Sequence, residues 1–311
     1  MKSLLLGGAG FIGTNLALKL AEVKNNVVTI VDKDLAYFNE IKKFNYSNIK
    51  YVESDFSEKT DFKRLLEGQD IVYHLISSTV PTTSNLHIAQ EIEANVVVTS
   101  YMLEACVACN VKRVVFISSG GTVYGINAAC PLNEDMPTEP ISSYGIQKIT
   151  IEKLLYLYNY MYNLDYRIVR LANPYGPFQR PNGILGAVTT FTNKVLRGET
   201  IIVYGDGSVV RDFIYIDDAI SAMLKIANED CRYKIYNVGS GYGTSISDLL
   251  YTIEKSLNMK VNVEYREARK VDVPVNYLDV SRYEKEFGKI DSVTLQEGIN
   301  RTANFLKNKM D

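Results

Sequence analysis

Histidine is scarce in this sequence, which limits the metal chemistry that the protein can carry. His74 and His87 are the only two imidazoles in 311 residues, and their spacing matches neither common metal motif. Cys106 and Cys109 form a C-x-x-C pair, but no second pair completes a zinc site. That pair closes a predicted helix, Tyr101 to Cys109, whereas an activated thiolate favours a helix N-terminus. We therefore expect no metal and interpret the two cysteines as structural.

A basic excess and a long apolar run are also missing. The 34 Lys and Arg residues face 36 Asp and Glu residues, so the net charge of -2 argues against a nucleic-acid partner. No stretch approaches the roughly 18 consecutive apolar residues of a membrane span. The opening segment, residues 1–6, leads into glycines without a basic leader or a cleavage site. We expect a cytoplasmic protein with no signal peptide and no membrane partner.

Short β-rich runs alternate with longer helical patterns through the first half of the chain. Several runs are apolar on consecutive residues, as expected when helices cover both faces of a sheet. This rhythm predicts an α/β fold with a doubly wound parallel sheet. The predicted strands are Ser3–Leu6, Val27–Val31, Ile49–Glu53, Ile71–Ile76, Val114–Ser118 and Tyr166–Arg170.

Beyond Asn173 the periodicity loosens, and proline and glycine punctuate the chain. We place a domain boundary there, with residues 1–173 as a dinucleotide-binding domain and residues 174–311 as a smaller α/β substrate-binding domain. Some segments of the second part are expected to return to the first sheet. The helices predicted in the second part are Gly186–Arg197, Asp217–Ala227 and Ser247–Leu257.

A glycine-rich turn follows the first predicted strand and opens a helix at Phe11. A tight turn, a close approach of the backbone to a pyrophosphate and close helix packing each require a residue without Cβ. Gly7, Gly10 and Gly13 fill these places, and a helix N-terminus favours negative phosphates. A merely structural turn is the alternative, but strand, turn and helix follow in the order of a dinucleotide site.

Two acidic residues follow the next predicted strands. Asp32 ends the second strand, where a carboxylate accepts hydrogen bonds from an adenosine ribose and repels a 2′-phosphate. NAD is therefore favoured over NADP, although Lys33 is a neighbouring cation that tolerates the extra phosphate. Asp55 follows the third strand and is a candidate for adenine contact, with solvation or helix capping as the alternative.

The catalytic candidate is the pair Tyr144 and Lys148, whose i, i+4 spacing on a predicted helix puts both side chains on one face. Lowering a phenol pKa by about 3 units requires roughly 4 kcal/mol. An ammonium about 4 Å away contributes about that much at an effective dielectric of about 20, and a nicotinamide cation adds to it. Tyr144 is then a plausible general base, and a chance pair on a solvated helix is the alternative.

With these motifs the chain resembles an extended short-chain dehydrogenase/reductase, and among these most closely the UDP-glucose (UDP-galactose) 4-epimerases of the NAD-dependent epimerase/dehydratase family. The resemblance spans nearly the whole length. Besides the glycine turn and Tyr144 with Lys148, it rests on the segments Ser118–Gly125, Asn173–Pro177, Val203–Gly207 and Arg211–Phe213, and on Arg269 with Asp272.

The resemblance implies a Rossmann fold, NAD, a UDP-linked sugar substrate, a homodimer and a role in polysaccharide biosynthesis. In the cycle that the resemblance implies, Tyr144 takes the proton of the sugar 4-hydroxyl as C4 passes hydride to NAD, and the ketone rotates before hydride returns. In the dimer the helices around residues 96–109 and 148–162 pair as a bundle, with tyrosines 156, 158, 160 and 162 packed or at the contact. Implied cofactor contacts are Gly7, Gly10, Phe11, Ile12, Gly13, Asp32, Asp55, Phe56, Leu75, Asn95, Ser118, Tyr144 and Lys148. Implied substrate contacts are Thr122, Asn173, Tyr204, Arg211, Arg269, Asp272 and Asn276.

One position departs from the resemblance. The epimerases usually carry Ser or Thr four residues before the tyrosine of the V-Y-G segment, and this chain has Gly120 there. Ser119 or Thr122 is left to supply the catalytic hydroxyl, and we favour Thr122. The Thr-Asp-Glu of related 4,6-dehydratases is also absent, which disfavours dehydration. A UDP-uronic acid epimerase or decarboxylase, another sugar-nucleotide dehydrogenase and a nucleotide-binding sensor stay open.

Asn276 lies four residues after Asp272, where the epimerases place a residue that limits the room beside the sugar C2 substituent. Because Asn is smaller than Tyr, we expect N-acetylated sugars to fit, unless Asn276 serves only to satisfy nearby backbone.

Overall fold

The computed structural model describes residues 1–33, 38–77, 84–181, 186–268, 273–290 and 292–309. These residues form two compact units, each built from separate segments of the chain. The first unit combines residues 1–118, 142–169 and 226–235, and the second combines residues 119–141, 170–225 and 236–311. Two predicted substrate contacts, Arg269 and Asp272, lie outside the described residues.

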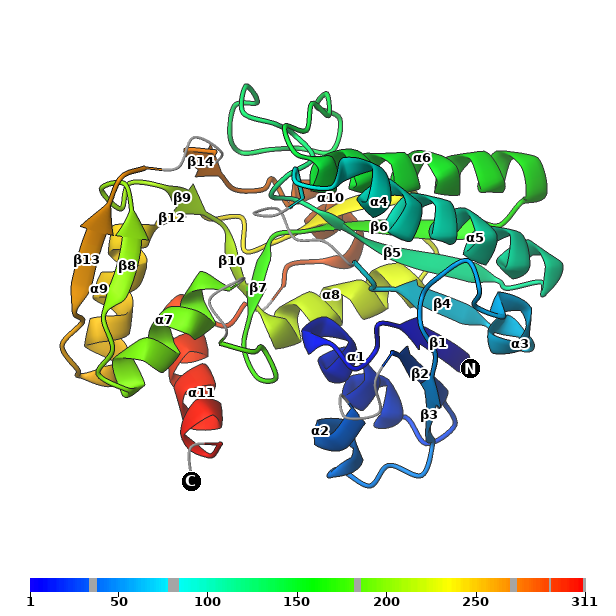
Figure 1. The fold of residues 1–311 in the computed structure, drawn as a ribbon, viewed down its shortest axis with the longest axis horizontal. Coiled ribbons are helices and arrows are strands. Elements are labelled where there is room, and N and C mark those ends of the chain that lie inside the picture. Colours follow the sequence, from blue (N-terminus) through cyan, green and yellow to red (C-terminus); the bar gives the residue numbers. More distant parts are fainter. Residues whose placement is uncertain (34–37, 78–83, 182–185, 269–272, 291, 310–311) are drawn as a thin grey trace. The chain divides into compact units, whose positions relative to one another are not determined.

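A seven-stranded parallel sheet in the order β11-β6-β5-β4-β1-β2-β3 organises the first unit (Figure 1). Helices α5 and α6 lie on one side of this sheet and α1 on the other (Figure 1). The strands are β1 (Lys2–Leu6), β2 (Val27–Asp32), β3 (Ile49–Glu53), β4 (Ile71–His74), β5 (Arg113–Ser119), β6 (Asp165–Leu171) and β11 (Ile235–Val238). The helices are α1 (Phe11–Ala21), α2 (Asn39–Lys42), α3 (Phe62–Leu66), α4 (Ile88–Ile92), the π-helix η2 (Glu93–Val97), α5 (Val98–Ala108) and α6 (Ser143–Tyr162).

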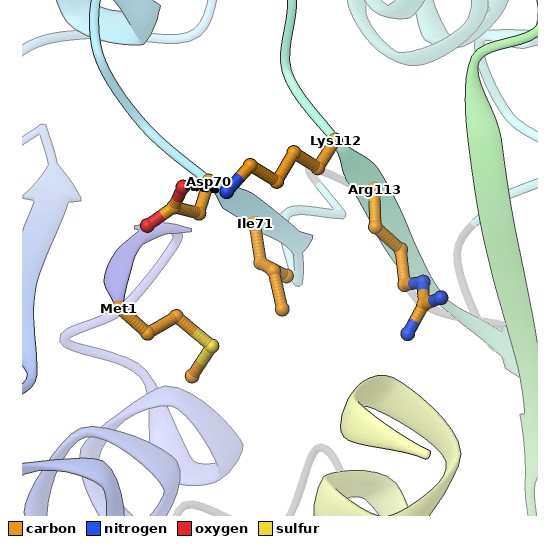
Figure 2. Close-up of a pocket in the computed structure, with 5 residues that line it drawn as sticks. All are labelled: Met1, Asp70, Ile71, Lys112 and Arg113. Atoms are coloured by element: carbon orange, nitrogen blue, oxygen red, sulfur yellow. Dashed lines mark ion pairs between the residues drawn. The ribbon is translucent and has the colours of Figure 1, made fainter. Parts of the chain in front are cut away.

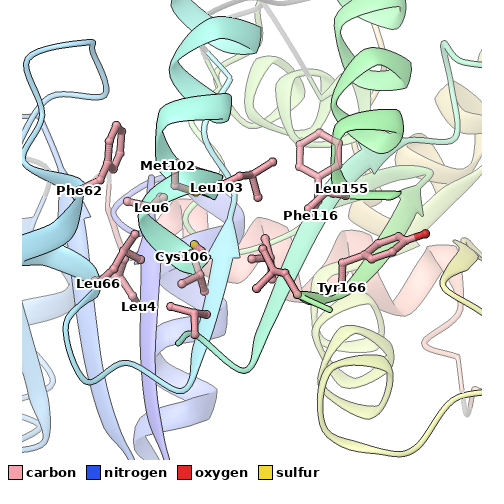
Figure 3. Packing of buried hydrophobic residues seen from close by; sticks show 14 of the residues in the cluster. Leu4, Leu6, Phe62, Leu66, Met102, Leu103, Cys106, Phe116, Leu155 and Tyr166 are labelled. Carbon is pink, nitrogen blue, oxygen red and sulfur yellow. The ribbon is translucent and has the colours of Figure 1, made fainter. Parts of the chain in front are cut away.

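The hydrophobic core of the first unit lies where α3, α5 and α6 cover this sheet (Figure 3). Leu4 and Leu6 of β1 and Phe116 of β5 meet Met102 of α5 and Leu155 of α6 in one buried cluster. Fully burying a side chain of this size stabilises the folded state by about 1.5–3 kcal/mol. The consecutive apolar residues that predicted a doubly wound sheet are thus explained, and the predicted fold class is confirmed.

Cys106 belongs to this core (Figure 3). Its side chain is fully buried, and burial raises the pKa of the Cys106 thiol well above its ordinary value. Cys109 follows the end of α5, and its Sγ lies 3.5 Å from the carbonyl oxygen of Lys63. A buried thiol in its neutral form is a small apolar side chain, which agrees with the structural interpretation of Cys106.

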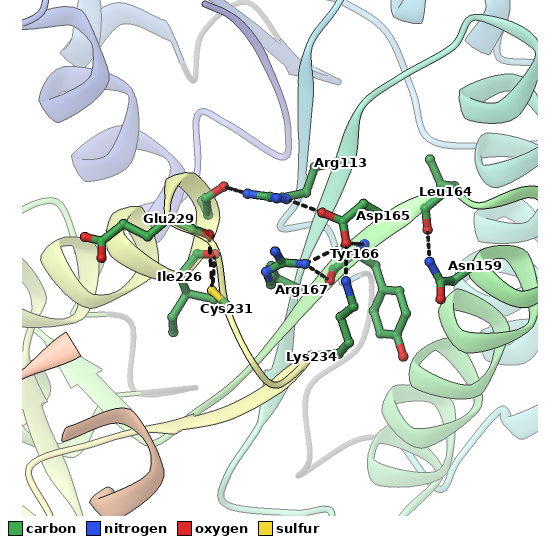
Figure 4. Close-up of polar contacts among 11 residues, drawn as sticks. Arg113, Asn159, Leu164, Asp165, Tyr166, Arg167, Ile226, Glu229, Cys231 and Lys234 are labelled. Atoms are coloured by element: carbon green, nitrogen blue, oxygen red, sulfur yellow. Dashed lines mark hydrogen bonds and ion pairs between the residues drawn. The ribbon is translucent and has the colours of Figure 1, made fainter. Parts of the chain in front are cut away.

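A charged cluster ties the returning segment 226–235 to the amino ends of β5 and β6 (Figure 4). The carboxylate of Asp165 accepts hydrogen bonds from Arg113 at 2.7 Å, Arg167 at 2.6 Å and Lys234 at 2.5 Å. Burial alone would raise the pKa of Asp165, but the hydrogen bonds from Lys234 and Arg113 outweigh it and hold the pKa at about 2. Arg113 also donates to the carbonyl of Ala227, so one guanidinium joins β5 to the returning segment.

In the part of the chain that the structure describes, the second unit consists of two- and three-stranded sheets and of helices. Its pairings are β10 with β7, β13 with β8, and β9 between β12 and β14. The strands are β7 (Asn173–Tyr175), β8 (Ile201–Tyr204), β9 (Val210–Arg211), β10 (Phe213–Tyr215), β12 (Thr244–Ser245), β13 (Val263–Arg266) and β14 (Val275–Asn276). The helices are α7 (Ala187–Leu196), α8 (Ile216–Asn228), α9 (Ile246–Leu257), α10 (Ser281–Phe287) and α11 (Leu295–Lys307).

The predicted elements match the observed ones to within a few residues, but the two units do not follow a single division at residue 173. Residues 119–141 belong to the second unit, and residues 226–235 return to the first. Strand β11 completes the seven-stranded sheet, although only its first residue, Ile235, belongs to the first unit. Among the described residues, no helix combines the length and the apolar character that crossing a bilayer requires.

Candidate active site

A surface pocket of about 390 Å³ lies at the amino ends of β1, β4 and β5 (Figure 2). Met1, Ile71 and Arg113 line it together with Asp70 and Lys112, whose carboxylate and ammonium are 2.8 Å apart. Ligands of open α/β sheets bind at the carboxyl ends of the strands, which lie at the opposite end of the sheet from this pocket. We therefore expect the functional site among the residues at the carboxyl ends.

The glycine turn between β1 and α1 is packed too tightly for side chains at two of its predicted positions. Gly7 has a φ of +77°, and a Cβ there would lie 2.8 Å from the side chain of Ile76. A Cβ on Gly13 would lie 2.5 Å from the Cα of Gly8, so the first turn of α1 rests directly on the glycine turn. These glycines hold the N-terminus of α1 against the end of β1.

The N-terminus of α1 offers backbone donors to an anion. Gly10 is the N-cap residue of α1, and it has an extended backbone and no side chain that could accept a hydrogen bond from the helix. The first hydrogen bond within the helix runs from Thr14 N to Gly10 O. The N–H groups of Phe11, Ile12 and Gly13 therefore have no acceptor within the helix. Three aligned N–H groups and the positive end of the helix dipole suit a pyrophosphate.

The acidic residue at the end of β2 lies beside this turn. One carboxylate oxygen of Asp32 accepts a hydrogen bond from Ala9 N at 3.1 Å, and the other accepts one from Lys33 N at 2.9 Å. A carboxylate fixed in this way keeps lone pairs for further donors, as the ribose prediction requires. Asp32 thus stabilises the glycine turn and lies at the carboxyl end of β2, where the cofactor is predicted to bind.

The other predicted cofactor contacts of β3 and β4 also follow the carboxyl ends of their strands. Asp55 is exposed and accepts a hydrogen bond from the backbone N–H of Phe56. Phe56 packs against the rings of Phe62 and His74, at centroid distances of 5.5 and 5.2 Å. Leu75 directly follows β4 and donates its N–H to Leu6 O. Phe56 therefore has a packing role, whereas Asp55 stays open to a ligand.

Tyr144 and Lys148 lie one turn apart near the N-terminus of α6. The helix begins after Ser142, whose hydroxyl accepts a hydrogen bond from Gly145 N and caps it. The Nζ of Lys148 donates to the carbonyl oxygen of Ile117 at 2.8 Å, and it lies 5.4 Å from the ring centroid of Tyr144. The structure therefore brings the predicted pair together at the carboxyl end of β5.

Burial controls the ionisation of this pair. It raises the pKa of Tyr144 to about 12, and it lowers the pKa of Lys148 to about 8, against the opposing charge of Glu152. The neighbouring ammonium does not offset the cost of burying a phenolate, because Nζ is directed to a backbone carbonyl. The expectation that one cation nearly suffices to activate Tyr144 is therefore not met by the protein alone.

The π-helix η2 lies between α4 and α5 and carries Asn95. The amide of Asn95 donates to the side chain of Gln147 at 2.8 Å and to Glu91 O at 3.0 Å. Gln147 in turn donates to Glu91 and to Ser143, the first residue of α6. Asn95 therefore fixes the first turns of α6, which carry Tyr144, and single π-helical turns are frequent at functional sites.

In the second unit, packing explains the glycine that departs from the epimerase pattern. A Cβ on Gly120 would lie 2.6 Å from a methyl carbon of Leu278, so this leucine occupies the space of the missing side chain. Asn276 is buried, and its amide lies 3.4 Å from Gly120 O and 3.3 Å from Gly121 O. Asn276 thus satisfies nearby backbone, which was the alternative to a role in sugar selection.

The two candidates for the replacement hydroxyl differ in environment. The Oγ1 of Thr122 is shielded from solvent and has no hydrogen-bond partner among the described residues. Ser119 is half-buried at the end of β5. Because a buried hydroxyl without a partner is costly, the observation favours Thr122 as a group that bonds a ligand.

The predicted nucleotide contacts of the second unit are anchored by backbone groups. Asn173 donates its side-chain N–H to Asp212 O at 2.9 Å. Arg211 donates to Val210 O at 2.8 Å and to Val273 O at 2.6 Å, which orients its guanidinium between two chain segments. Tyr204 ends β8 and is half-buried. Of the two arginines predicted to grip a diphosphate, only Arg211 is among the described residues.

Three residues of the site escaped the sequence prediction. A Cβ on Gly8 would lie 2.8 Å from the side chain of Ile30, so this fourth glycine is as tightly packed as Gly7. Glu152 is buried one turn beyond Lys148 and accepts a 2.5 Å hydrogen bond from Ser118. Burial raises the pKa of Asp212 even though Ser240, Leu278 and Gly241 donate to it. The i+8 spacing from Tyr144 was an available signal for Glu152.

Comparisons with known proteins agree with this architecture. The chain is 32% identical over 316 residues to the UDP-glucose 4-epimerase of Mycolicibacterium smegmatis, covering 99% of both chains. The structure of a UDP-glucose 4-epimerase from Thermotoga maritima with UDP-glucose is similar, with a TM-score of 0.92, 31% identity and full coverage of both chains. A UDP-glucuronic acid 4-epimerase from Bacillus cereus, in complex with UDP-glucuronic acid and NAD, gives a TM-score of 0.90 at 26% identity, with 99% of this chain and all of that one covered.

The model of one protein family matches residues 3–239, which include the glycine turn, Asp32 and the pair on α6. This match and the relatives confirm the predicted resemblance, the dependence on NAD and the prediction of an epimerase-type enzyme. The chain belongs to the NAD dependent epimerase/dehydratase family.

Proposed function

We propose that the protein inverts C4 of a UDP-linked hexose and that Tyr144 is the group that removes and returns the proton of the 4-hydroxyl. The observation that carries this proposal is the pair on α6, with Tyr144 one turn from a Lys148 whose Nζ is held at the carboxyl end of β5. The glycine turn and Asp32 supply a dinucleotide site in the same unit. Relatives named as UDP-glucose 4-epimerases support the substrate class.

When bound, NAD supplies the hydride acceptor for the sugar C4. The N-terminus of α1 and Asp32 bind it, and Lys148 donates to a ribose hydroxyl and to the carbonyl of Ile117. The positive charge that an oxidised nicotinamide would add beside Tyr144 would lower the pKa of its phenol from about 12, so that the phenolate could accept the proton of the sugar 4-hydroxyl. Thr122 supplies the hydroxyl that hydrogen-bonds the sugar oxygen in place of a residue at position 120.

In the second unit, Asn173, Tyr204 and Arg211 hold the nucleotide diphosphate, with Arg269 and Asp272 as further predicted contacts. Anchoring the diphosphate leaves the sugar free to turn, so hydride returns to the opposite face of the ketone. A guanidinium already oriented by two carbonyls loses little side-chain freedom when it binds a phosphate.

A UDP-uronic acid is the second candidate substrate, because the Bacillus cereus relative is a UDP-glucuronic acid 4-epimerase. Purified protein is incubated with UDP-glucose, UDP-N-acetylglucosamine and UDP-glucuronic acid, and proton NMR identifies the products. We expect UDP-galactose from UDP-glucose, and turnover of the uronate alone would replace the proposed substrate. The Tyr144→Phe variant should lose conversion but still bind UDP, and turnover by this variant refutes its role as base.

Assembly as a homodimer is part of the proposal. The outer faces of α5 and α6 expose Tyr101, Tyr156, Leu157, Tyr160 and Met161, and Tyr160 is 79% exposed. Exposed apolar patches of this kind mark protein contacts. The cytoplasmic location stays a prediction from the sequence.

A further inference from the structure

Two neighbouring residues of β5 hold two successive turns of α6. The carbonyl oxygen of Ile117 accepts a hydrogen bond from the Nζ of Lys148 at 2.8 Å. The hydroxyl of Ser118 donates a hydrogen bond to the carboxylate of Glu152 at 2.5 Å. Lys148 and Glu152 are four residues apart on α6, so their side chains share one face of the helix. The lysine and the carboxylate are thereby fixed side by side at the end of the strand.

This carboxylate is costly to bury, which calls for a reason beyond packing. The side chains of Ser118, Lys148 and Glu152 are all at most 6% exposed. An isolated buried charge is strongly unfavourable, whereas a buried pair of opposite charges with hydrogen-bond partners is tolerated. Glu152 has both a donor, Ser118, and a cation on the preceding turn.

The groups around Lys148 differ in how they act on its charge. His74 on β4 is fully buried, and burial together with the charge of Lys148 lowers the pKa of this histidine to about 3, so it is neutral. The rings of Phe116 on β5 and Tyr144 on α6 lie 4.7 and 5.4 Å from Nζ, and these cation–π contacts favour the ammonium. Burial lowers the pKa of Lys148 to about 8, and Glu152 is the charged group that opposes this shift.

We propose that Glu152 is a positioning residue of the active site, whose carboxylate, fixed by Ser118, keeps Lys148 in its ammonium form and aimed at the end of β5. If Lys148 were neutral, the positive charge beside Tyr144 would be lost, and the amine would have one N–H donor fewer than the ammonium. Glu152 touches neither substrate nor cofactor in this scheme, and it acts through Lys148. Its importance for catalysis rests on the proposed function, but its effect on the ionisation of Lys148 does not.

The test replaces Glu152 with glutamine, which keeps an oxygen to accept from Ser118 and removes only the charge. Lysine labelled with ¹³C at Cε reports the titration of Lys148 by NMR, and the signal is assigned by its loss in Lys148→Met. Wild type should titrate near pH 8, and E152Q about one to two pH units lower, as expected for the loss of a charge one helical turn away. Glu67→Gln, at an exposed position after α3, is the matched control, and Lys148 should titrate in this variant as it does in wild type.

A Lys148 titration in E152Q within half a unit of wild type overturns the proposal, as does an upward shift. Ser118→Ala is the second variant and should lower the titration in the same direction, because the carboxylate loses its donor. In turnover assays, the alkaline limb of the pH profile of kcat should move down by the same one to two units in E152Q. If wild type turns over no UDP-sugar while E152Q still moves the titration, the proposed function fails and the role of Glu152 stands.

Discussion

Two glycines of the turn before α1 should respond differently to replacement by alanine, although both belong to the same predicted motif. Gly10 is exposed with a φ of -73°, and the nearest atom to an added Cβ is Gly7 O at 3.3 Å. For Gly13 the nearest atoms are the Cα of Gly8 at 2.5 Å and Gly7 O at 2.7 Å. Backbone atoms on both sides cannot rotate away, so α1 must shift by roughly 1 Å to restore an ordinary carbon contact of about 3.5 Å.

These contacts set the expected magnitudes. Gly10→Ala should change the free energy of unfolding by less than about 1 kcal/mol, since its backbone angles suit alanine and the contact is mild. Gly13→Ala overpacks a rigid contact and should cost about 1–3 kcal/mol or more. For a chain of this size, that loss corresponds to a fall in Tm of roughly 2–4 °C per kcal/mol. Both variants should lose NAD, the first because its Cβ obstructs the pyrophosphate and the second because the helix N-terminus is displaced.

The assay combines calorimetric melting with the NAD content of the purified protein, released by acid and measured by absorbance. Retained stability with lost NAD in Gly10→Ala, and loss of both in Gly13→Ala, would support the geometry. Wild-type NAD content in Gly10→Ala would show that no phosphate approaches this residue and would refute the reasoning.

Three further predictions concern other parts of the molecule. Asp165→Asn should lower the free energy of unfolding by about 2 kcal/mol at pH 7. Because the pKa of Asp165 is held at about 2 in the folded state, urea unfolding should show this difference from wild type shrinking as the pH falls from about 4 to 2. Thr122→Val should lower kcat by about 100-fold or more while Ser119→Ala changes it little, and equal effects in the turnover assay would contradict the assignment of the replacement hydroxyl. Tyr160→Glu should produce a monomer in light scattering, and an unchanged dimer would place the contact elsewhere.

The sequence predicted what local rules determine. The strands of the first sheet and the glycine turn follow from hydrophobic runs and from the steric demands of a strand-turn-helix connection, both of which are readable over about ten residues. The pair Tyr144 and Lys148 follows from helical spacing alone. The structure forms the expected strands, turn and helix at these positions, because the causes of each lie within a single segment.

Contacts between distant segments were beyond such rules. The side chain of Leu278, 158 positions away in the sequence, occupies the space that a side chain at position 120 would need. No residue near Gly120 in the sequence indicates this contact. The two carbonyls that Asn276 contacts, those of Gly120 and Gly121, lie 156 and 155 positions away from it in the sequence. The raised pKa of Tyr144 depends on how deeply the phenol is buried, which no spacing on a helix specifies.

The raised pKa changes how the reaction is best understood. With a pKa of about 12, the phenol of Tyr144 is protonated at neutral pH, so its resting form is a proton donor. It becomes an acceptor only when a positive charge is added nearby, and the oxidised nicotinamide carries that charge whereas the reduced one does not. In the proposed reaction, proton removal would therefore be coupled to the oxidised state of the cofactor and proton return to its reduced state. A base that the buried lysine alone kept ionised would lack this coupling, because its pKa would be the same in both redox states of the cofactor.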